Sequence, residues 1–165
     1  MSKYIICVFL LIFSCVANAQ WITRSEENIF NEKKSFMMGT LSNSSGVIGF
    51  DCDNGELSIS YIEEDKKTES VKAPMNLMIK IDSNDIVKFD AIMDRRNDNS
   101  MEIASNDRIG IISLLSQLKN AKSKFLIGIV LPGTDAKSSY YGDVAGSTKA
   151  VDKLVSDCGI DLNAK

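Results

Sequence analysis

Two cysteines, Cys52 and Cys158, are the residues of this sequence whose chemistry is easiest to name. The other two, Cys7 and Cys15, lie in an apolar N-terminal segment that we expect to be removed. Redox-active and metal-binding cysteines usually stand close together as Cys-x-x-Cys, whereas Cys52 and Cys158 are far apart. We therefore predict a structural disulfide between them. In the loop-entropy model, closing a loop of about a hundred residues stabilises a fold by roughly 4 to 5 kcal/mol.

The sequence contains no histidine, which is both the commonest metal ligand and the commonest general base in proteins. Ser-His-Asp and Cys-His catalytic sites are therefore excluded. Four carboxylates, Asp94, Asp98, Glu102 and Asp107, could supply the acid and base pair of a glycosidase-like site, but their spacing selects no pair. We predict that the protein is not an enzyme and holds no metal or cofactor, with a carboxylate-based hydrolase as an alternative.

Five side chains are candidates for contact with a partner. Arg95 and Arg96 could pair with a carboxylate or phosphate of a ligand, or close a local salt bridge in a solvated turn. Tyr140 and Tyr141 are adjacent, so in a strand one would face the core and the other solvent. Trp21, the one tryptophan, could anchor a partner or pack over the edge of a sheet and hold the N-terminus in place.

The N-terminus has the features of a secretory signal peptide. Lys3 is followed by an apolar run over residues 4–13 and by the small-residue sequence Ala17-Asn18-Ala19. Cleavage after Ala19 divides the chain into a signal peptide, 1–19, and one secreted or periplasmic domain, 20–165, of about 145 residues. Two alternatives are lipidation of Cys15 and an uncleaved anchor, although the run is shorter than the roughly twenty residues that cross a bilayer.

The charges are spread along the chain, with a net charge of −3 and no basic block. Nucleic acids and anionic membrane surfaces are therefore poor partners, and we expect no membrane span after cleavage. Charged residues make up 25% of the chain and hydrophobic residues 44%, which is the ordinary balance of a folded domain. These features favour a protein as the partner.

Alternating apolar residues predict most of the strands. Residues 48–52 and 57–61 alternate on either side of Asn54-Gly55, which predicts a hairpin with Cys52 on its inward face. The polar run 95–99 is typical of a turn, and the continuous apolar run 125–131 predicts a central strand covered on both faces. The other predicted strands are 35–41, 75–81, 87–93 and 101–104.

Two helices complete the predicted fold. Asn106-Asp107 begins the first, whose buried stripe is predicted to contain Ile111, Ile112, Leu115 and Leu118. Ser147 is predicted to cap the second, which directs Cys158 toward the sheet and ends at Gly159. We predict an α+β fold, with a mostly antiparallel sheet of about six or seven strands, two helices packed on one face, and one disulfide.

The chain from about Trp21 to Gly159 resembles the periplasmic accessory proteins associated with type VI secretion, the VasI or TagO-like family. The resemblance rests on residues 87–95, on Met101-Glu102-Ile103-Ala104-Ser105, on the 109–118 helix and on the 125–131 strand. The most similar piece is the ending, in which Ala150-Val151 and Leu154 precede Cys158-Gly159. The resemblance implies no enzyme activity, no cofactor and no catalytic residues.

We therefore expect a non-enzymatic binding protein, periplasmic or secreted, and the resemblance implies an accessory of a type VI-like secretion machine. The alternative from another class is an inhibitor or immunity protein that blocks a periplasmic hydrolase or toxin. Such a protein would insert a loop such as 94–99 or 133–143 into its target.

Overall fold

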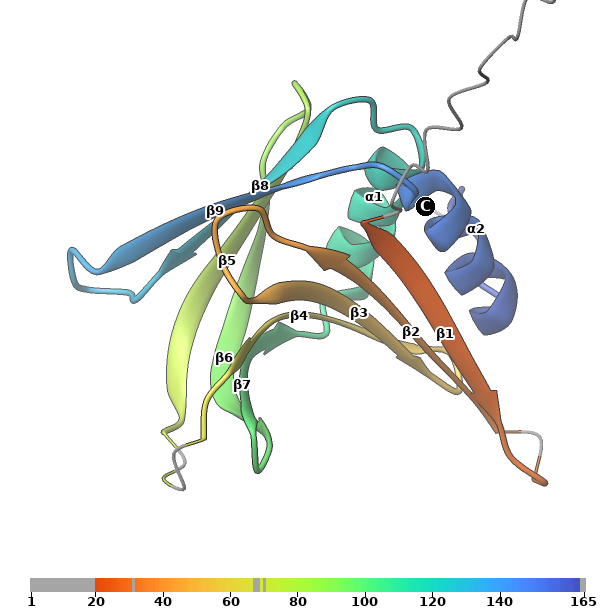
Figure 1. The fold of residues 1–165 in the computed structure, drawn as a ribbon, viewed down its shortest axis with the longest axis horizontal. Coiled ribbons are helices and arrows are strands. Elements are labelled where there is room, and N and C mark those ends of the chain that lie inside the picture. Colours follow the sequence, from red (N-terminus) through yellow and green to blue (C-terminus); the bar gives the residue numbers. More distant parts are fainter. Residues whose placement is uncertain (1–19, 31, 67–68, 70, 164–165) are drawn as a thin grey trace, which may run out of the picture.

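A computed structural model describes residues 20–163, apart from residues 31, 67–68 and 70. The predicted signal peptide and Cys15 lie outside the described residues. Nine antiparallel strands form one sheet in the order β1-β2-β3-β4-β7-β6-β5-β8-β9, which curls into a half-barrel (Figure 1). The strands are β1 (Trp21–Glu27), β2 (Lys33–Thr40), β3 (Val47–Asp53), β4 (Glu56–Glu64), β5 (Ala73–Ile81), β6 (Val87–Asn97), β7 (Ser100–Ser105), β8 (Lys124–Val130) and β9 (Lys137–Asp143).

The prediction of six or seven strands is wrong, because the sheet has nine. The two additional strands, β1 and β9, lie at the two ends of the strand order. In each of them one residue is buried, Trp21 in β1 and Gly142 in β9. A polar edge strand is buried over only a small part of its length. Its sequence therefore lacks the alternation that marks a half-buried strand.

Two other sequence predictions about strands need correction. The polar run 95–99 is not all turn, since β6 continues to Asn97 and the chain reverses at residues 98–99. The apolar run 125–131 is not a central strand buried on both faces. It forms β8, second from the end of the sheet, and its burial alternates.

The hairpin predicted at Asn54-Gly55 is confirmed. It joins β3 and β4, and both turn residues have positive φ, 51° for Asn54 and 86° for Gly55. This is the conformation that favours Asn-Gly in a two-residue hairpin turn. The turn fixes the register of β3, so Phe50 and Cys52 are buried while Asp51 faces the other side of the sheet.

Two helices, α1 (Arg108–Lys119) and α2 (Ser147–Cys158), pack side by side on one face of the described sheet, which we call the helix face (Figure 1). The Asp107 side chain accepts hydrogen bonds from the amides of Ile109 and Gly110, which confirms the predicted start of α1. The buried residues of α1 are Ile111, Leu114, Leu115 and Leu118. The opposite face of the sheet is called the open face.

The start of α2 differs from its prediction. Gly146, in the left-handed conformation, occupies the cap position, and Ser147 is the first helical residue. The buried Ser147 hydroxyl donates to the carbonyl of Leu118 at 2.8 Å, so it joins the two helices instead of capping one. The predicted end is confirmed at Gly159, with a φ of 61°.

The core contains the predicted disulfide and the tryptophan. Cys52 of β3 is bonded to Cys158 of α2, with their Cα atoms 6.3 Å apart and a sequence separation of 106. The Trp21 ring is 3% exposed and packs edge-on against Phe125, with ring centroids 5.2 Å apart. Its Nε1 donates to the carbonyl of Asp143 at 2.8 Å. This bond connects the start of β1 to the end of β9.

Candidate functional site

A pocket on the open face of β2 and β3 brings several charged side chains and one ring together. Strand register places them there: Phe36 lies opposite Asp51, and Lys34 lies opposite Asp53. Cross-strand partners share a face of the sheet, so all four point away from the helices. Arg24 of β1 lies opposite Phe36 and extends the same row.

The pocket has a volume of about 450 Å³. We call it the Arg96 pocket, after the one lining residue that comes from the other half of the sheet. Its walls come from three strands, β1, β2 and β3, and from the end of β6. The lining residues are Arg24, Glu26, Lys34, Ser35, Phe36, Asp51, Cys52, Asp53 and Arg96.

Arg96 crosses the open face and holds this surface together. One guanidinium nitrogen donates to Glu102 of β7 at 2.6 Å and lies 3.4 Å from the Ser60 hydroxyl of β4. The other donates to Asp51 of β3 at 2.7 Å. The guanidinium carbon lies 5.3 Å from the centre of the Phe36 ring, within the range of a cation–π contact. One side chain therefore links four strands.

The charges around Arg96 are matched and partly desolvated. Burial acts to lower the pKa of Arg96, but the hydrogen bonds and charges of Asp51 and Glu102 outweigh it, so the pKa is raised. The side chain of Arg96 is 26% exposed. The second carboxylate oxygen of Asp51 is buried and has no hydrogen-bond partner among the described residues. A guanidinium held this way is fixed in one orientation, which is the condition for low-cost recognition.

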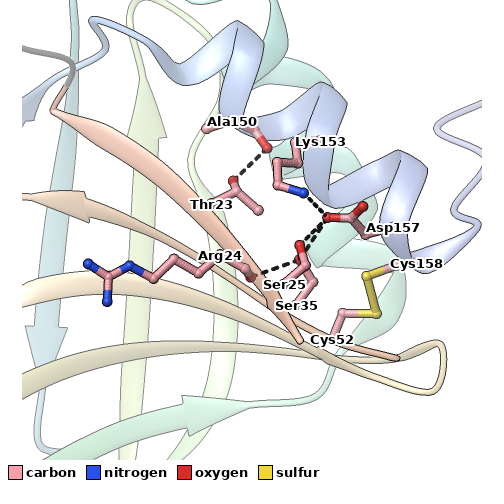
Figure 2. A network of polar contacts seen from close by, with 9 residues as sticks. All are labelled: Thr23, Arg24, Ser25, Ser35, Cys52, Ala150, Lys153, Asp157 and Cys158. Carbon is pink, nitrogen blue, oxygen red and sulfur yellow. Dashed lines mark hydrogen bonds and ion pairs between the residues drawn. A yellow bond between two sulfur atoms is a disulfide. The ribbon is translucent and has the colours of Figure 1, made fainter. Parts of the chain in front are cut away.

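Arg24 differs from Arg96 because its guanidinium is exposed and, among the described residues, lies in no salt bridge. Figure 2 shows its side chain extending away from α2 and from the disulfide. Lys34, the third cation of the pocket, is paired with Asp53 at 2.7 Å. The pocket thus offers one uncommitted cation, one aromatic ring and a set of paired charges. This arrangement can bind a charged and partly apolar surface.

A second polar cluster, drawn in Figure 2, fastens α2 to β1 and β2. The carboxylate of Asp157 accepts from the hydroxyls of Ser25 and Ser35 and is paired with Lys153 at 2.9 Å. Thr23 donates to the carbonyl of Ala150 at 2.8 Å. Both serine hydroxyls contact a carboxylate that already neutralises the lysine. The cluster is therefore a structural clamp, in which two hydroxyls and one ammonium group already occupy the carboxylate.

The pKa of Asp157 is lowered from its ordinary value. Burial acts to raise it, but the hydrogen bonds and charge of Lys153 and the hydroxyls of Ser25 and Ser35 outweigh burial. The carboxylate therefore stays ionised in the folded protein at neutral pH. Its ionised form strengthens the clamp between α2 and the first hairpin.

The structure separates the two predicted arginines. Arg96 lies in the pocket, whereas Arg95 faces the other side of β6 and donates to the carbonyl of Asp65 at 2.6 Å. Arg95 also forms an ion pair with the Asp65 carboxylate at 3.5 Å and contacts the carbonyl of Asp98 at 3.2 Å. These contacts hold the ends of β4 and β6 together, and Arg95 does not line the Arg96 pocket.

The two predicted tyrosines also separate. Tyr140 stacks on Tyr61 of β4, with ring centroids 5.1 Å apart and planes inclined by 7°. The Tyr61 hydroxyl donates to Glu63 at 2.8 Å, and burial raises the pKa of this phenol. Tyr141 is 47% exposed on β9, and its backbone bonds to Ser42 and Asn43. Neither tyrosine lines the Arg96 pocket.

Sequence reasoning identified Arg96 but missed Arg24, Phe36, Asp51 and Glu102 as its neighbours. A signal existed for two of them. The predicted strand at 35–41 places Phe36 and the predicted hairpin places Asp51 on the faces opposite Met37 and Cys52.

Metal and membrane features are limited in the described part of the chain. Within it, no three Cys, Asp or Glu side chains gather as a metal site. No described helix combines the length and apolar character needed to cross a membrane.

No family model, curated protein or solved structure matches this chain.

Proposed function

We propose that this chain is a non-enzymatic binding protein that docks a protein partner on the open face of β1, β2 and β3. The observation that carries the proposal is the clamping of Arg96 by Asp51 and Glu102 over the Phe36 ring, beside a pocket of about 450 Å³. A rigid surface of paired charges and one aromatic ring supports recognition better than catalysis.

The chemistry of the pocket is that of a protein contact. Arginine and aromatic side chains are enriched among the residues that dominate interface energies. Arg24 can form a bidentate pair with a partner carboxylate, because its guanidinium is exposed and in no salt bridge among the described residues. Arg96 and Phe36 then form the fixed floor on which that contact is made.

The proposed location is the periplasm or the extracellular space. The N-terminal signal-like sequence and the disulfide both support it, since stable disulfides form in oxidising compartments. From the resemblance to type VI secretion-associated proteins, we propose that the partner belongs to an envelope-spanning secretion machine.

The test is a comparison of variants in partner capture from envelope extracts. Arg24→Glu reverses the one cation of the pocket that lies in no salt bridge among the described residues, so we expect folding to be unchanged and capture to fall by about tenfold or more. Lys88→Glu is the matched control, because Lys88 is an exposed residue of β6 outside the pocket. Equal capture by both variants would contradict the proposed docking surface.

An inhibitor of a hydrolase or toxin is the second candidate. It is favoured by the hairpin of β8 and β9, which extends from the body of the molecule and in which residues 132–139 are all exposed (Figure 1). Inhibitors of this kind insert an exposed loop into an active-site cleft. A one-to-one complex with an enzyme, lost on deletion of residues 133–136 and retained in Arg24→Glu, would favour this candidate over the first.

A further inference from the structure

We propose that the turn between β1 and β2 anchors the contact, with Ile29 and Phe30 entering an apolar pocket that is bordered by basic side chains on a protein partner. This inference rests on the proposed function and names the chemistry of the partner. It assigns the anchoring role to a segment outside the Arg96 pocket.

The side chains of Ile29 and Phe30 are largely exposed to solvent. Ile29 is 89% exposed and Phe30 is 75% exposed, and they are neighbours in the sequence. Single exposed apolar residues are common on protein surfaces, but an adjacent aliphatic and aromatic pair at the end of a hairpin forms a patch. Burying both side chains in a partner would remove their apolar surface from water, which favours association.

Hydrogen bonds of Asn28 hold this turn in shape. The Asn28 side-chain oxygen accepts from the amides of Phe30 at 2.9 Å and of Glu32 at 3.2 Å. The Asn28 amide group donates to the Glu32 carboxylate at 2.6 Å, and the Asn28 backbone donates to the Glu32 carbonyl at 3.2 Å. These four bonds fix the backbone that presents the two apolar side chains. A preorganised loop loses less entropy on binding than a flexible one.

The tip of the hairpin carries more negative than positive charge. Three carboxylates, Glu26, Glu27 and Glu32, surround the tip and outnumber its two lysines, Lys33 and Lys34. Lys34 is already paired with Asp53. The excess of negative charge favours a partner with basic residues around its pocket and opposes an anionic lipid surface. It also opposes a symmetric contact between two copies, because that contact would bring the same acidic tips together.

The hairpin of β1 and β2 is continuous with the Arg96 pocket. Arg24, Glu26 and Lys34 line that pocket and belong to the same two strands that lead to the tip. The base of this hairpin is fixed to α2 through Thr23 and Ser25 (Figure 2). The tip and the pocket therefore move as one body and can be covered by one partner.

The first experiment places a photo-crosslinker at the tip of the full chain. Phe30→p-benzoylphenylalanine is compared with Ile109→p-benzoylphenylalanine. Ile109 is similarly exposed, at 83%, but lies in the first turn of α1 and not in the hairpin. We expect irradiation in cells to join position 30, and not position 109, to one protein other than this chain. An adduct between two copies, equal adducts from both positions, or no adduct would overturn the inference.

The second experiment measures affinity for the protein identified by crosslinking. Ile29→Ser and Phe30→Ser are each expected to weaken binding by about 30-fold, and Ile109→Ser is expected to leave it unchanged. Unchanged binding in Phe30→Ser, with binding lost in Arg24→Glu, would overturn the anchor and leave the proposed function standing. Unchanged binding in both would overturn the two together. Co-flotation of the wild-type chain with phosphatidylglycerol vesicles, abolished in Phe30→Ser, would show a lipid contact and overturn the protein partner.

Discussion

The two faces of the β3 strand differ in what holds them. On the helix face, Phe50 is fully buried and Cys52 is covalently bonded to α2. On the open face, the intervening Asp51 is ion-paired with Arg96 and lines the Arg96 pocket. Residues that follow one another in the chain therefore serve different purposes, because the side-chain period of a strand is two. Changes on the helix face should alter stability, and changes on the open face should mainly alter binding.

The largest expected effect is on the helix face. Phe50→Ala removes a fully buried ring that lies 6.3 Å from the Trp21 ring, and we expect the free energy of unfolding to fall by about 3 to 5 kcal/mol. Chemical denaturation followed by tryptophan fluorescence measures it. Phe50→Leu should cost clearly less, since it leaves a smaller cavity. A loss below about 1 kcal/mol for Phe50→Ala would contradict the assignment of the core.

The disulfide gives the next largest effect. Cys52→Ser and Cys158→Ser should each lower the free energy of unfolding by about 2 to 4 kcal/mol, because each removes the same constraint on the unfolded chain. The double variant should lose little more than either single one. Denaturation midpoints of the three variants under non-reducing conditions test this. Additive losses would show that the two cysteines do not act as a pair.

On the open face, Arg96→Ala should cost about 1 to 2 kcal/mol of stability, since Asp51 and Glu102 lose their partner while remaining partly hydrated. Its effect on partner binding should be larger than its effect on stability. Arg96→Lys keeps the charge but not the two-pronged contact, so it should restore stability better than binding. Lys88→Ala serves as the control. A loss of stability equal to that of Phe50→Ala would contradict the division between the faces.

The smallest effect concerns pH and the clamp between α2 and the hairpin. The pKa of Asp157 is lower in the folded protein than in the unfolded chain. Its contribution to stability is therefore complete above the unfolded pKa of about 3.9 and is lost as the pH falls through the lower folded value. Asp157→Asn should be less stable than wild type at pH 6, and the difference should shrink as the pH falls below about 3.9. Asp135→Asn, at an exposed loop position, should match wild type throughout.

The sequence predicted those parts of the fold whose cause is local. The turn at Asn54-Gly55 needs positive φ at two residues, and the start of α1 needs a side-chain acceptor at Asp107. The disulfide followed from counting cysteines. By contrast, β1 and β9 lie at the edges of the sheet, which no local pattern reveals. Ser147 stands where a helix cap is expected in the sequence, but its hydroxyl bonds to α1, which is distant in the chain.

The candidate site was predictable only in fragments. Arg96 stood out as a possible ligand-binding residue, but its partners come from β3 and β7, which lie on either side of β4. The strand order depends on how the whole sheet curls, which is a property of all nine strands. Alternation along β2 and β3 could place Phe36 and Asp51 on one face, yet it could not bring Arg96 to them.

The Cys52–Cys158 bond also sets the time at which the domain can be completed. It joins the third strand to the final helix, and the two cysteines have a sequence separation of 106. During synthesis or export, β3 must therefore wait with a free thiol while six further strands and α1 emerge. In the predicted mature chain Cys158 is the intramolecular partner of Cys52, so refolding from the reduced chain should require an oxidant, whereas refolding with the bond intact should not.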